Sequence, residues 1–352
     1  MKPFCLIIFC LYISTAIFAQ RTDKRFEPIQ QQIQAWVDSG HYKGAALLIT
    51  HQNKVVYQSL FGSYTPQTVV YIASAGKWLA AATIAALVDE GKLKWTDKAN
   101  QWIPELKDSK GEATLAQLLS HTAGYPDYQP KGKPTDITQD LATSVANIIP
   151  LPADTLVGKK FKYGGLAMQV AGRMAELATG KNWEELFQEK IAKPLGMTQT
   201  HFTPVDSAGG HAPMLGGGAR STLNDYVNFL SMIYNNGTYQ GKRVLSEKVI
   251  RFMQADQVGK AKVAPGEFVE RARGTKGNAI YGLGEWREEV NNKGEPTLIS
   301  SPSWAGAYPW IDKKYHIYGF LITHITGFKK NFSPFYTSHQ LALEIRKIIQ
   351  VK

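Results

Sequence analysis

The chain has 352 residues, of which 44% are hydrophobic and 20% charged, as in an ordinary globular protein. Its formal net charge is +11, but the basic residues are scattered in ones and twos, such as Lys159-Lys160 and Lys313-Lys314. Nucleic-acid-binding proteins gather such residues on one face or in one module, so we expect no nucleic-acid partner.

The first twenty residues have the pattern of a secretory signal peptide. One lysine precedes an apolar run over residues 4–18, and the small residue Ala19 follows it. A membrane-spanning helix needs about 20 apolar residues, so this run is short for a span. We therefore expect cleavage after Ala19, a periplasmic or secreted protein, and no stable membrane span after cleavage. Both cysteines, Cys5 and Cys10, lie in residues 1–19, which leaves the mature chain without thiol nucleophiles or cysteine-ligated metals.

The segment after the signal predicts a helix, a hairpin and a third strand. Apolar residues at helical spacing favour a helix over 26–38. Two runs of strand-forming residues around Gln52-Asn53 predict a hairpin over 44–62, and a short strand is expected at 69–72. A run rich in alanine and leucine, without proline, then predicts a helix over about 74–90.

The rest of the chain changes character twice. Between residues 92 and 215, helical segments alternate with loops marked by proline and glycine. The clearest helices there are expected at 115–119, 143–149 and 166–179. Beyond that region we expect a helix at 223–234, strands at 280–286, 297–300 and 315–323, and a final helix at 338–349. This order predicts one α/β (α+β) domain over 20–352, with a sheet lobe of about 20–73 and 216–352 and a mostly helical insertion of about 74–215.

Ser74 and Lys77 lie three residues apart at the start of a predicted helix, so their side chains share one face. A neighbouring lysine that has lost its proton can activate a serine hydroxyl as a nucleophile. The alternative is that Ser74 only caps the helix, because four-residue Ser-x-x-Lys matches arise easily by chance. Two observations favour catalysis. No other serine in this chain has a lysine three residues later, and a lysine opposes the positive potential of a helix N-terminus.

The residues around this pair resemble those of serine β-lactamases and penicillin-binding-protein-like hydrolases. The resemblance is strongest to the branch of class C β-lactamases, D-aminopeptidases and β-lactamase-like carboxylesterases. Six segments match in order, at Tyr71–Lys77, Leu87–Leu93, Thr114–Gly124, Pro194–Met197, Gly216–Thr222 and Trp310–Asp312. The resemblance implies a β-lactamase/transpeptidase-like fold, in which an antiparallel sheet lobe flanked by helices carries a mostly helical inserted lobe.

The resemblance also implies a set of catalytic residues. Members of this family form an acyl-enzyme on the serine of Ser-x-x-Lys, which is Ser74 here. Their second motif, Tyr-x-Asn, falls at Tyr163-Gly164-Gly165, so Tyr163 would relay the proton together with Lys77. Gly165 replaces the asparagine that binds the substrate amide, which puts peptide-like substrates in doubt. No cofactor is implied, and the eight histidines form no tight metal motif.

The family's third motif, Lys-Thr-Gly or His-x-Gly, falls at Ser301-Pro302-Ser303, with Trp304-Ala305-Gly306 as the competing placement. Neither placement has the cation that holds a substrate carboxylate in the family, which favours simpler esters or amides. The candidate substrate-binding residues are therefore Gly165, Ser301, Ser303 and Trp304. The oxyanion hole would combine the Ser74 N–H with an N–H from residues 303–304.

Three further features have more ordinary interpretations. His121 is interpreted as part of a structural turn rather than as a triad histidine. Gly216–Gly218 lacks the flanking strand and helix of a nucleotide-binding loop, so we expect it to allow close backbone packing behind the site. Of Trp304, Tyr308 and Trp310, one is expected to face the substrate.

These observations predict an exported serine hydrolase that transfers an acyl group from a small-molecule or peptide-like ester or amide to water. Esterase- or peptidase-like activity is favoured over true β-lactamase activity, because the second and third motifs depart from the family pattern. The same departures motivate an alternative of a different class, a catalytically weak, penicillin-binding-like sensor of cell-wall fragments or β-lactams. The sequence makes no prediction of the oligomeric state.

Overall fold

The computed structural model describes residues 23–126, 140–202, 213–263, 279–327 and 332–350. The expected signal peptide, its cleavage site and both cysteines lie outside these residues. Within the described segments, no helix combines the length and the apolar character that crossing a membrane requires.

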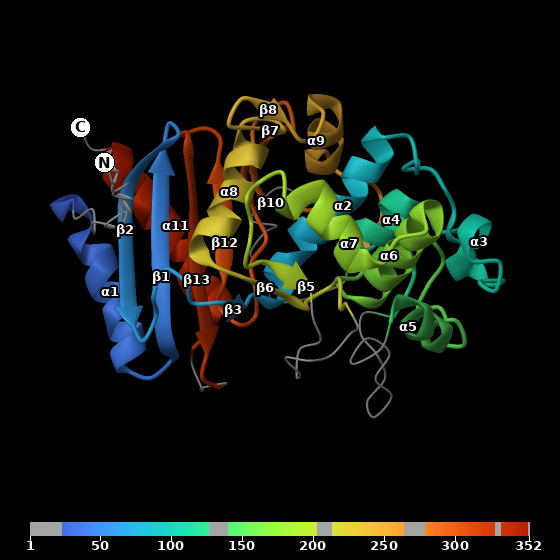
Figure 1. Ribbon diagram of the computed structural model, residues 1–352, viewed down its shortest axis with the longest axis horizontal. Helices are drawn as coiled ribbons and strands as arrows, with labels where there is room; N and C mark the ends of the chain where they lie inside the picture. Colours follow the sequence, from blue (N-terminus) through green and yellow to red (C-terminus); the bar gives the residue numbers. More distant parts are fainter. Residues whose placement is uncertain (1–22, 127–139, 203–212, 264–278, 328–331, 351–352) are drawn as a thin grey trace, which may run out of the picture.

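One side of the molecule is a six-stranded antiparallel sheet in the order β10-β11-β12-β13-β1-β2 (Figure 1). Its strands run over Tyr42–His51 (β1), Lys54–Gly62 (β2), Trp286–Val290 (β10), Pro296–Ser300 (β11), Tyr308–Asp312 (β12) and Ile317–Ile325 (β13). The expected hairpin at 44–62 is confirmed as β1 and β2. Because β1 also pairs with β13, with Leu47 opposite Leu321, the two ends of the chain form one sheet.

Helices cover both faces of this sheet and form the second lobe. They run over Glu27–Asp38 (α1), Gly76–Asp89 (α2), Ala99–Trp102 (α3), Leu115–Leu119 (α4), Leu141–Ile148 (α5), Leu166–Thr179 (α6), Trp183–Phe187 (α7), Leu223–Tyr234 (α8), Glu247–Gln254 (α9) and Pro334–Gln350 (α11). Helices α1 and α11 pack on one face, where Ile33, Leu47 and Leu341 share a buried cluster. Helix α8 packs against β13 on the other face. The expected α/β class is confirmed.

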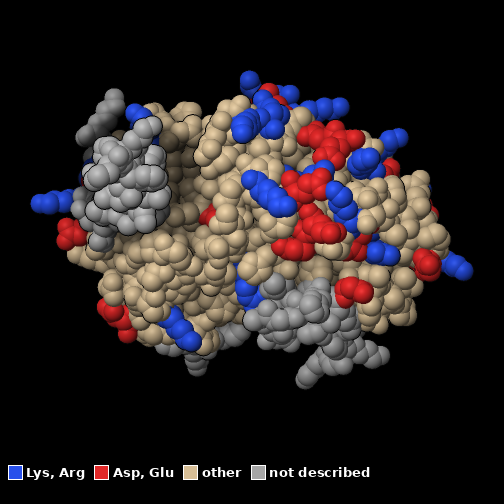
Figure 2. All heavy atoms as spheres, viewed as in Figure 1, with Lys and Arg blue, Asp and Glu red and all other residues tan. Residues whose placement is uncertain are grey.

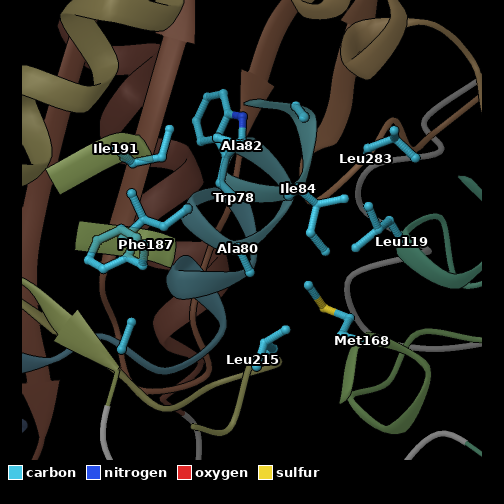
Figure 3. Close-up of a cluster of buried hydrophobic side chains, with 14 of the residues drawn as sticks. Trp78, Ala80, Ala82, Ile84, Leu119, Met168, Phe187, Ile191, Leu215 and Leu283 are labelled. Atoms are coloured by element: carbon cyan, nitrogen blue, oxygen red, sulfur yellow. The ribbon is translucent and has the colours of Figure 1, made fainter. Parts of the chain in front are cut away.

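Helix α2 is the centre of the helical lobe. All its residues from Gly76 to Leu87 are buried, as expected of a helix that is apolar all round. Figure 3 shows its Trp78 and Ile84 among side chains from other segments, including Phe187 and Met168. This packing holds the N-terminal end of α2, and with it Ser74, in one position relative to both lobes.

The described residues also form three smaller sheets. Strands β3 (Val70–Tyr71), β6 (Ala219–Ser221) and β5 (His201–Phe202) form the one that leads into Ser74. The other two pair β4 (Lys160–Phe161) with β9 (Lys262–Val263), and β7 (Thr238–Tyr239) with β8 (Lys242–Arg243). On the face that Figure 2 shows, basic and acidic side chains are intermixed rather than separated by sign.

The prediction of a strand at 280–286 was wrong, because β10 begins only at Trp286. The preceding residues form a loop pressed against two helices. A Cβ on Gly282 would stand 2.1 Å from the Met253 carbonyl oxygen, and one on Gly284 2.5 Å from the Lys77 carbonyl oxygen. Gly284 also has a φ of +75°, which glycine adopts readily. These two glycines allow the loop to pack closely against α9 and α2, and they do not belong to a strand.

Candidate active site

Ser74 lies in a 3-10 turn, Ala73–Ala75, between β3 and α2. Helix α2 begins at Gly76, and the residue before it contributes no capping side chain, so the alternative that Ser74 only caps the helix is not supported. Ala73 has a φ of +46°, a left-handed conformation that costs a non-glycine residue on the order of 1 kcal/mol. Strain directly before a buried serine is typical of a functional position.

Lys77 is fully buried and points at the serine. Its Nζ donates to the Ser74 Oγ at 3.1 Å and to the Gly216 carbonyl oxygen. The ring of Tyr163 completes the group, with its centroid 4.6 Å from the same Nζ. A buried amine needs such partners because desolvation is costly. The Ser74 hydroxyl, the Lys77 amine and the ring of Tyr163 therefore lie together, which brings the three residues that the sequence singled out into one place.

Two glycines allow this arrangement. A Cβ on Gly216 would stand 2.8 Å from the Gly165 Cα and 3.6 Å from the Lys77 Nζ. The absence of a side chain lets the Gly216 carbonyl reach the lysine, which confirms the close packing expected of Gly216–Gly218. Gly165 is the N-cap residue of α6 and faces this glycine with backbone only.

Tyr163 sits in an aromatic group that the sequence did not predict. The rings of His121, Tyr281 and Trp286 lie 4.7, 6.0 and 5.2 Å from its ring, centroid to centroid. The His121 Nε2 is 3.2 Å from the Tyr281 hydroxyl. Burial lowers the pKa of His121 well below its usual value, so this imidazole is neutral at pH 7. We assign it to orienting Tyr163 through ring contact.

The third-motif segment continues β11 alongside β12. The Ser301 N–H donates to the Pro309 carbonyl at 3.2 Å, and the Ser303 N–H donates to the Ala307 carbonyl at 2.8 Å. In an antiparallel ladder, successive N–H groups point to opposite sides of a strand. The intervening position, which faces away from β12, is Pro302 and has no N–H to donate.

Both serine hydroxyls of this segment are used within the protein. The Ser301 Oγ lies 3.3 Å from the Ser74 carbonyl oxygen and 3.1 Å from that of Gly284. The Ser303 Oγ accepts from the Ala305 N–H at 3.0 Å. Both residues are buried: Ser301 holds the strand end against the turn that carries Ser74, and Ser303 holds the turn that follows it.

The three aromatic residues near this strand end differ in exposure. Tyr308 and Trp310 are each 1% exposed and belong to the core between the sheet and α1 and α11, whereas Trp304 is 36% exposed. Trp304 is therefore the one of the three that is placed to meet a ligand.

Comparison with known proteins identifies the family. The family model described as Beta-lactamase matches residues 29–340, so the chain belongs to the beta-lactamase family. This confirms the resemblance seen in the sequence and the β-lactamase/transpeptidase-like fold.

Three of the similar proteins carry names of hydrolases. A solved structure from Bacteroides dorei DSM 17855, provisionally described as a beta-lactamase, is 50% identical, with a TM-score of 0.87 over 92% of this chain and 98% of that one. The D-alanyl-D-alanine-carboxypeptidase/endopeptidase AmpH of Escherichia coli K12 is 26% identical over 75% of this chain and 74% of its own. A family VIII carboxylesterase, 19% identical, shares the fold with a TM-score of 0.71 over 93% of this chain and 97% of that one. The family match and the first two of these relatives support a hydrolase, and the third supports the fold.

Proposed function

We propose that this protein is a serine hydrolase that cleaves an ester or amide through an acyl-enzyme on Ser74. The observation that carries the proposal is the buried Lys77 Nζ, 3.1 Å from the Ser74 Oγ and aimed by the Gly216 carbonyl. A hydroxyl is a weak nucleophile until a base within hydrogen-bond reach takes its proton. Lys77 is the only amine that the described residues place in that contact.

The proposed reaction has two halves. Lys77 takes the Ser74 proton, the Oγ attacks the substrate carbonyl, and the carbonyl oxygen becomes an oxyanion. As the scissile bond breaks, Tyr163 passes the proton to the departing alcohol or amine, which leaves the acyl group on Ser74. Water, deprotonated by the same pair, then attacks the acyl carbonyl. The bond to the Ser74 Oγ breaks, the pair returns the proton to that oxygen, and the acid leaves. The Tyr163 ring, whose centroid lies 4.6 Å from the Lys77 Nζ, supports placing this residue beside the pair, and transfer of the proton through its hydroxyl is part of the proposal.

The oxyanion would be held by the Ser74 N–H and the Trp304 N–H. Residues 301 and 303 direct their N–H groups to β12, and Pro302 has none. Trp304 follows this segment directly, at a turn beside the strand end that contacts the Ser74 carbonyl, so its N–H is the proposed second donor. Because removing one oxyanion donor typically costs about 10²–10³ in rate, a hydrolase on this frame needs the second donor.

The substrate is proposed to be a small or peptide-like ester or amide, with esterase- or peptidase-like activity favoured over true β-lactamase activity. The absence of a lysine or histidine from Ser301-Pro302-Ser303 supports this ranking. Export is proposed from the signal-like pattern of residues 1–19.

The first test is Ser74→Ala. We expect the variant to lose at least about 10³-fold in kcat/KM on p-nitrophenyl butyrate, because no nucleophile remains. Intact mass after treatment with a fluorophosphonate should show one adduct on the unaltered protein and none on the variant. The exposed Ser63→Ala is the control and should keep both activity and adduct. Unchanged hydrolysis by Ser74→Ala would overturn the assignment.

The alternative of a weakly catalytic sensor has a distinct outcome in the same experiment. Gly165 and the third-motif segment offer a peptide-like ligand fewer side-chain contacts than the family motifs do. A fluorescent penicillin adduct that stays on Ser74 for hours, without ester turnover, would favour the sensor over the hydrolase.

A further inference from the structure

Four side chains outside the proposed catalytic group meet beside the nucleophile, and we call them the Arg220 cluster: Tyr71, Arg220, Trp304 and His324. Tyr71 on β3 is the direct cross-strand partner of Arg220 on β6. The guanidinium carbon of Arg220 lies 5.6 Å from the Tyr71 ring centroid, within cation–π range. The rings of Trp304 and His324 lie 6.5 and 5.5 Å from that of Tyr71, and 5.8 Å from each other.

The cluster borders the proposed reaction centre on two sides. Tyr71 precedes Ser74 by three residues, and its hydroxyl lies 3.6 Å from where a Cβ on Gly217 would stand. Gly217 directly follows the residue whose carbonyl accepts from the catalytic lysine. Trp304 follows the strand end that contacts the Ser74 carbonyl, and its N–H is the proposed second oxyanion donor. A substrate group that binds in the Arg220 cluster would therefore lie only a few bonds from the scissile carbonyl.

The cluster faces away from the core. The strand neighbours Val70 and Ser221 are 4% and 0% exposed, whereas Tyr71 and Arg220 are partly exposed on the opposite side of the small sheet. Trp304 is among the most exposed large apolar side chains of the described residues. An exposed indole beside a tyrosine ring offers a flat apolar surface, which is the usual lining of a small-molecule site.

The charge of the cluster comes from arginine. The His324 Nδ1 lies 3.1 Å from the Tyr71 carbonyl oxygen, which can only accept, so this nitrogen carries the proton. Burial lowers the pKa of His324, and the cations Arg220 and Lys43 lower it further, so the imidazole is neutral at pH 7. A guanidinium held over a ring is suited to bind a carboxylate through two parallel hydrogen bonds.

We propose that the Arg220 cluster binds a carboxylate of the substrate through Arg220, with the adjoining apolar part of the substrate on Trp304 and Tyr71. This inference rests on the proposed acyl-enzyme function and names its substrate class: esters or amides with a free carboxylate a few bonds from the scissile carbonyl. The anion contact that Ser301-Pro302-Ser303 lacks would thus come from a different strand, β6. A carboxylate bound by Arg220 would lie on a different side of Ser74 from a carboxylate bound by the third-motif segment after β11.

The test compares two esters of matched length, mono-p-nitrophenyl glutarate, which carries a carboxylate, and p-nitrophenyl valerate, which does not. We expect the unaltered protein to prefer the glutarate in kcat/KM. Arg220→Met should lower the glutarate-to-valerate ratio by about 10- to 100-fold, mostly through KM, because a charge-assisted contact is lost. Arg220→Lys should give an intermediate ratio, and the preference should weaken with added salt.

Two comparisons make the outcome decisive. Arg243→Met, at an exposed arginine on β8, should leave the ratio unchanged. A ratio near one in the unaltered protein, or a ratio that Arg220→Met does not alter, would overturn the inference. If Ser74→Ala still hydrolyses both esters, the proposed function itself fails. If Ser74→Ala is inactive and no anion preference is found, only the Arg220 cluster is refuted.

Discussion

At the scale of single residues, the geometry around Ser74 depends on groups that lack side chains or hold an unusual conformation. Ala73 takes a left-handed φ to present the serine, and Gly216 brings its carbonyl to Lys77 where a side chain would not fit. Ser74 in the 3-10 turn and Lys77 in the first turn of α2 are only three residues apart, but the Gly216 carbonyl that accepts from the lysine lies 139 residues away in the sequence. The geometry of the proposed catalytic group therefore depends on residues outside that group, so a substitution elsewhere can disturb it.

Gly216→Ala tests this dependence. Its Cβ would meet the Gly165 Cα at 2.8 Å, so the backbone must shift and the carbonyl that aims Lys77 must move with it. We expect kcat on p-nitrophenyl butyrate to fall by about 10- to 100-fold, in line with the cost of a small misplacement of catalytic groups. Gly327→Ala is the matched control, since a Cβ there meets nothing within 4 Å. Full activity of Gly216→Ala would contradict the role assigned to this carbonyl.

Tyr163→Phe separates the hydroxyl of this residue from its ring. The phenyl ring preserves the contacts with His121 and Trp286, so the melting temperature should change little. We expect kcat to fall by about 10²–10⁴-fold, the usual contribution of a positioned acid–base group. A variant that keeps its kcat would show that Tyr163 acts only by packing.

At the scale of elements, one arginine of α11 forms ion pairs with two strands of the sheet. The Arg346 Nε lies 2.5 Å from Asp312 on β12, and its other nitrogens lie 2.9 and 3.0 Å from Glu289 on β10. The Asp312 side chain is only 3% exposed, so without this arginine its carboxylate would be buried and uncompensated. The helix and two strands of the sheet are thereby coupled.

Arg346→Met should lower the free energy of unfolding in urea by about 3 kcal/mol, because breaking a buried pair leaves a desolvated charge behind. The control is Arg251→Met, whose arginine side chain is 68% exposed in its pair with Glu247, and which should cost less than about 1 kcal/mol. If the two variants lose the same free energy of unfolding, Arg346 does not compensate a buried charge on Asp312.

At the scale of the whole molecule, Glu285 is a fully buried carboxyl group next to the helix that carries the site. Neither carboxylate oxygen has a hydrogen-bond partner among the described residues. Burial raises the pKa of Glu285 to about 8, against the partly offsetting attraction of Lys313 and Arg287. Because the folded protein holds this proton more tightly than the unfolded chain, stability falls as pH rises from about 4.5 to about 8.

Glu285→Gln should flatten this dependence. The amide cannot ionise, so the difference in melting temperature between variant and unaltered protein should shift in favour of the variant as pH rises from 5 to 8. His339, whose pKa is raised by Glu288 despite burial, contributes a change of the same sign in both proteins and cancels in the difference. Parallel pH profiles for the two proteins would refute a buried, protonated Glu285.

Much of the fold follows from local patterns. The hairpin at residues 44–62, the helix after Ser74 and the helix at 166–179 lie where periodicity and composition predicted them. The strand expected at 280–286 failed because alternation in a glycine-containing run does not reveal which helices pass close by. The aromatic group around Tyr163 was missed for the same reason, since its members come from three separate segments.

The sequence by itself determined the family, the α/β class and the pairing of Ser74 with Lys77, because these depend on local order and on spacing along one helix. Only the tertiary structure decided that the Gly216 carbonyl aims Lys77 from 139 residues away. It alone brought Arg220 onto Tyr71 beside Trp304. Such contacts depend on the register between strands and on how two lobes pack, and these are properties of the folded chain that no short stretch of sequence contains.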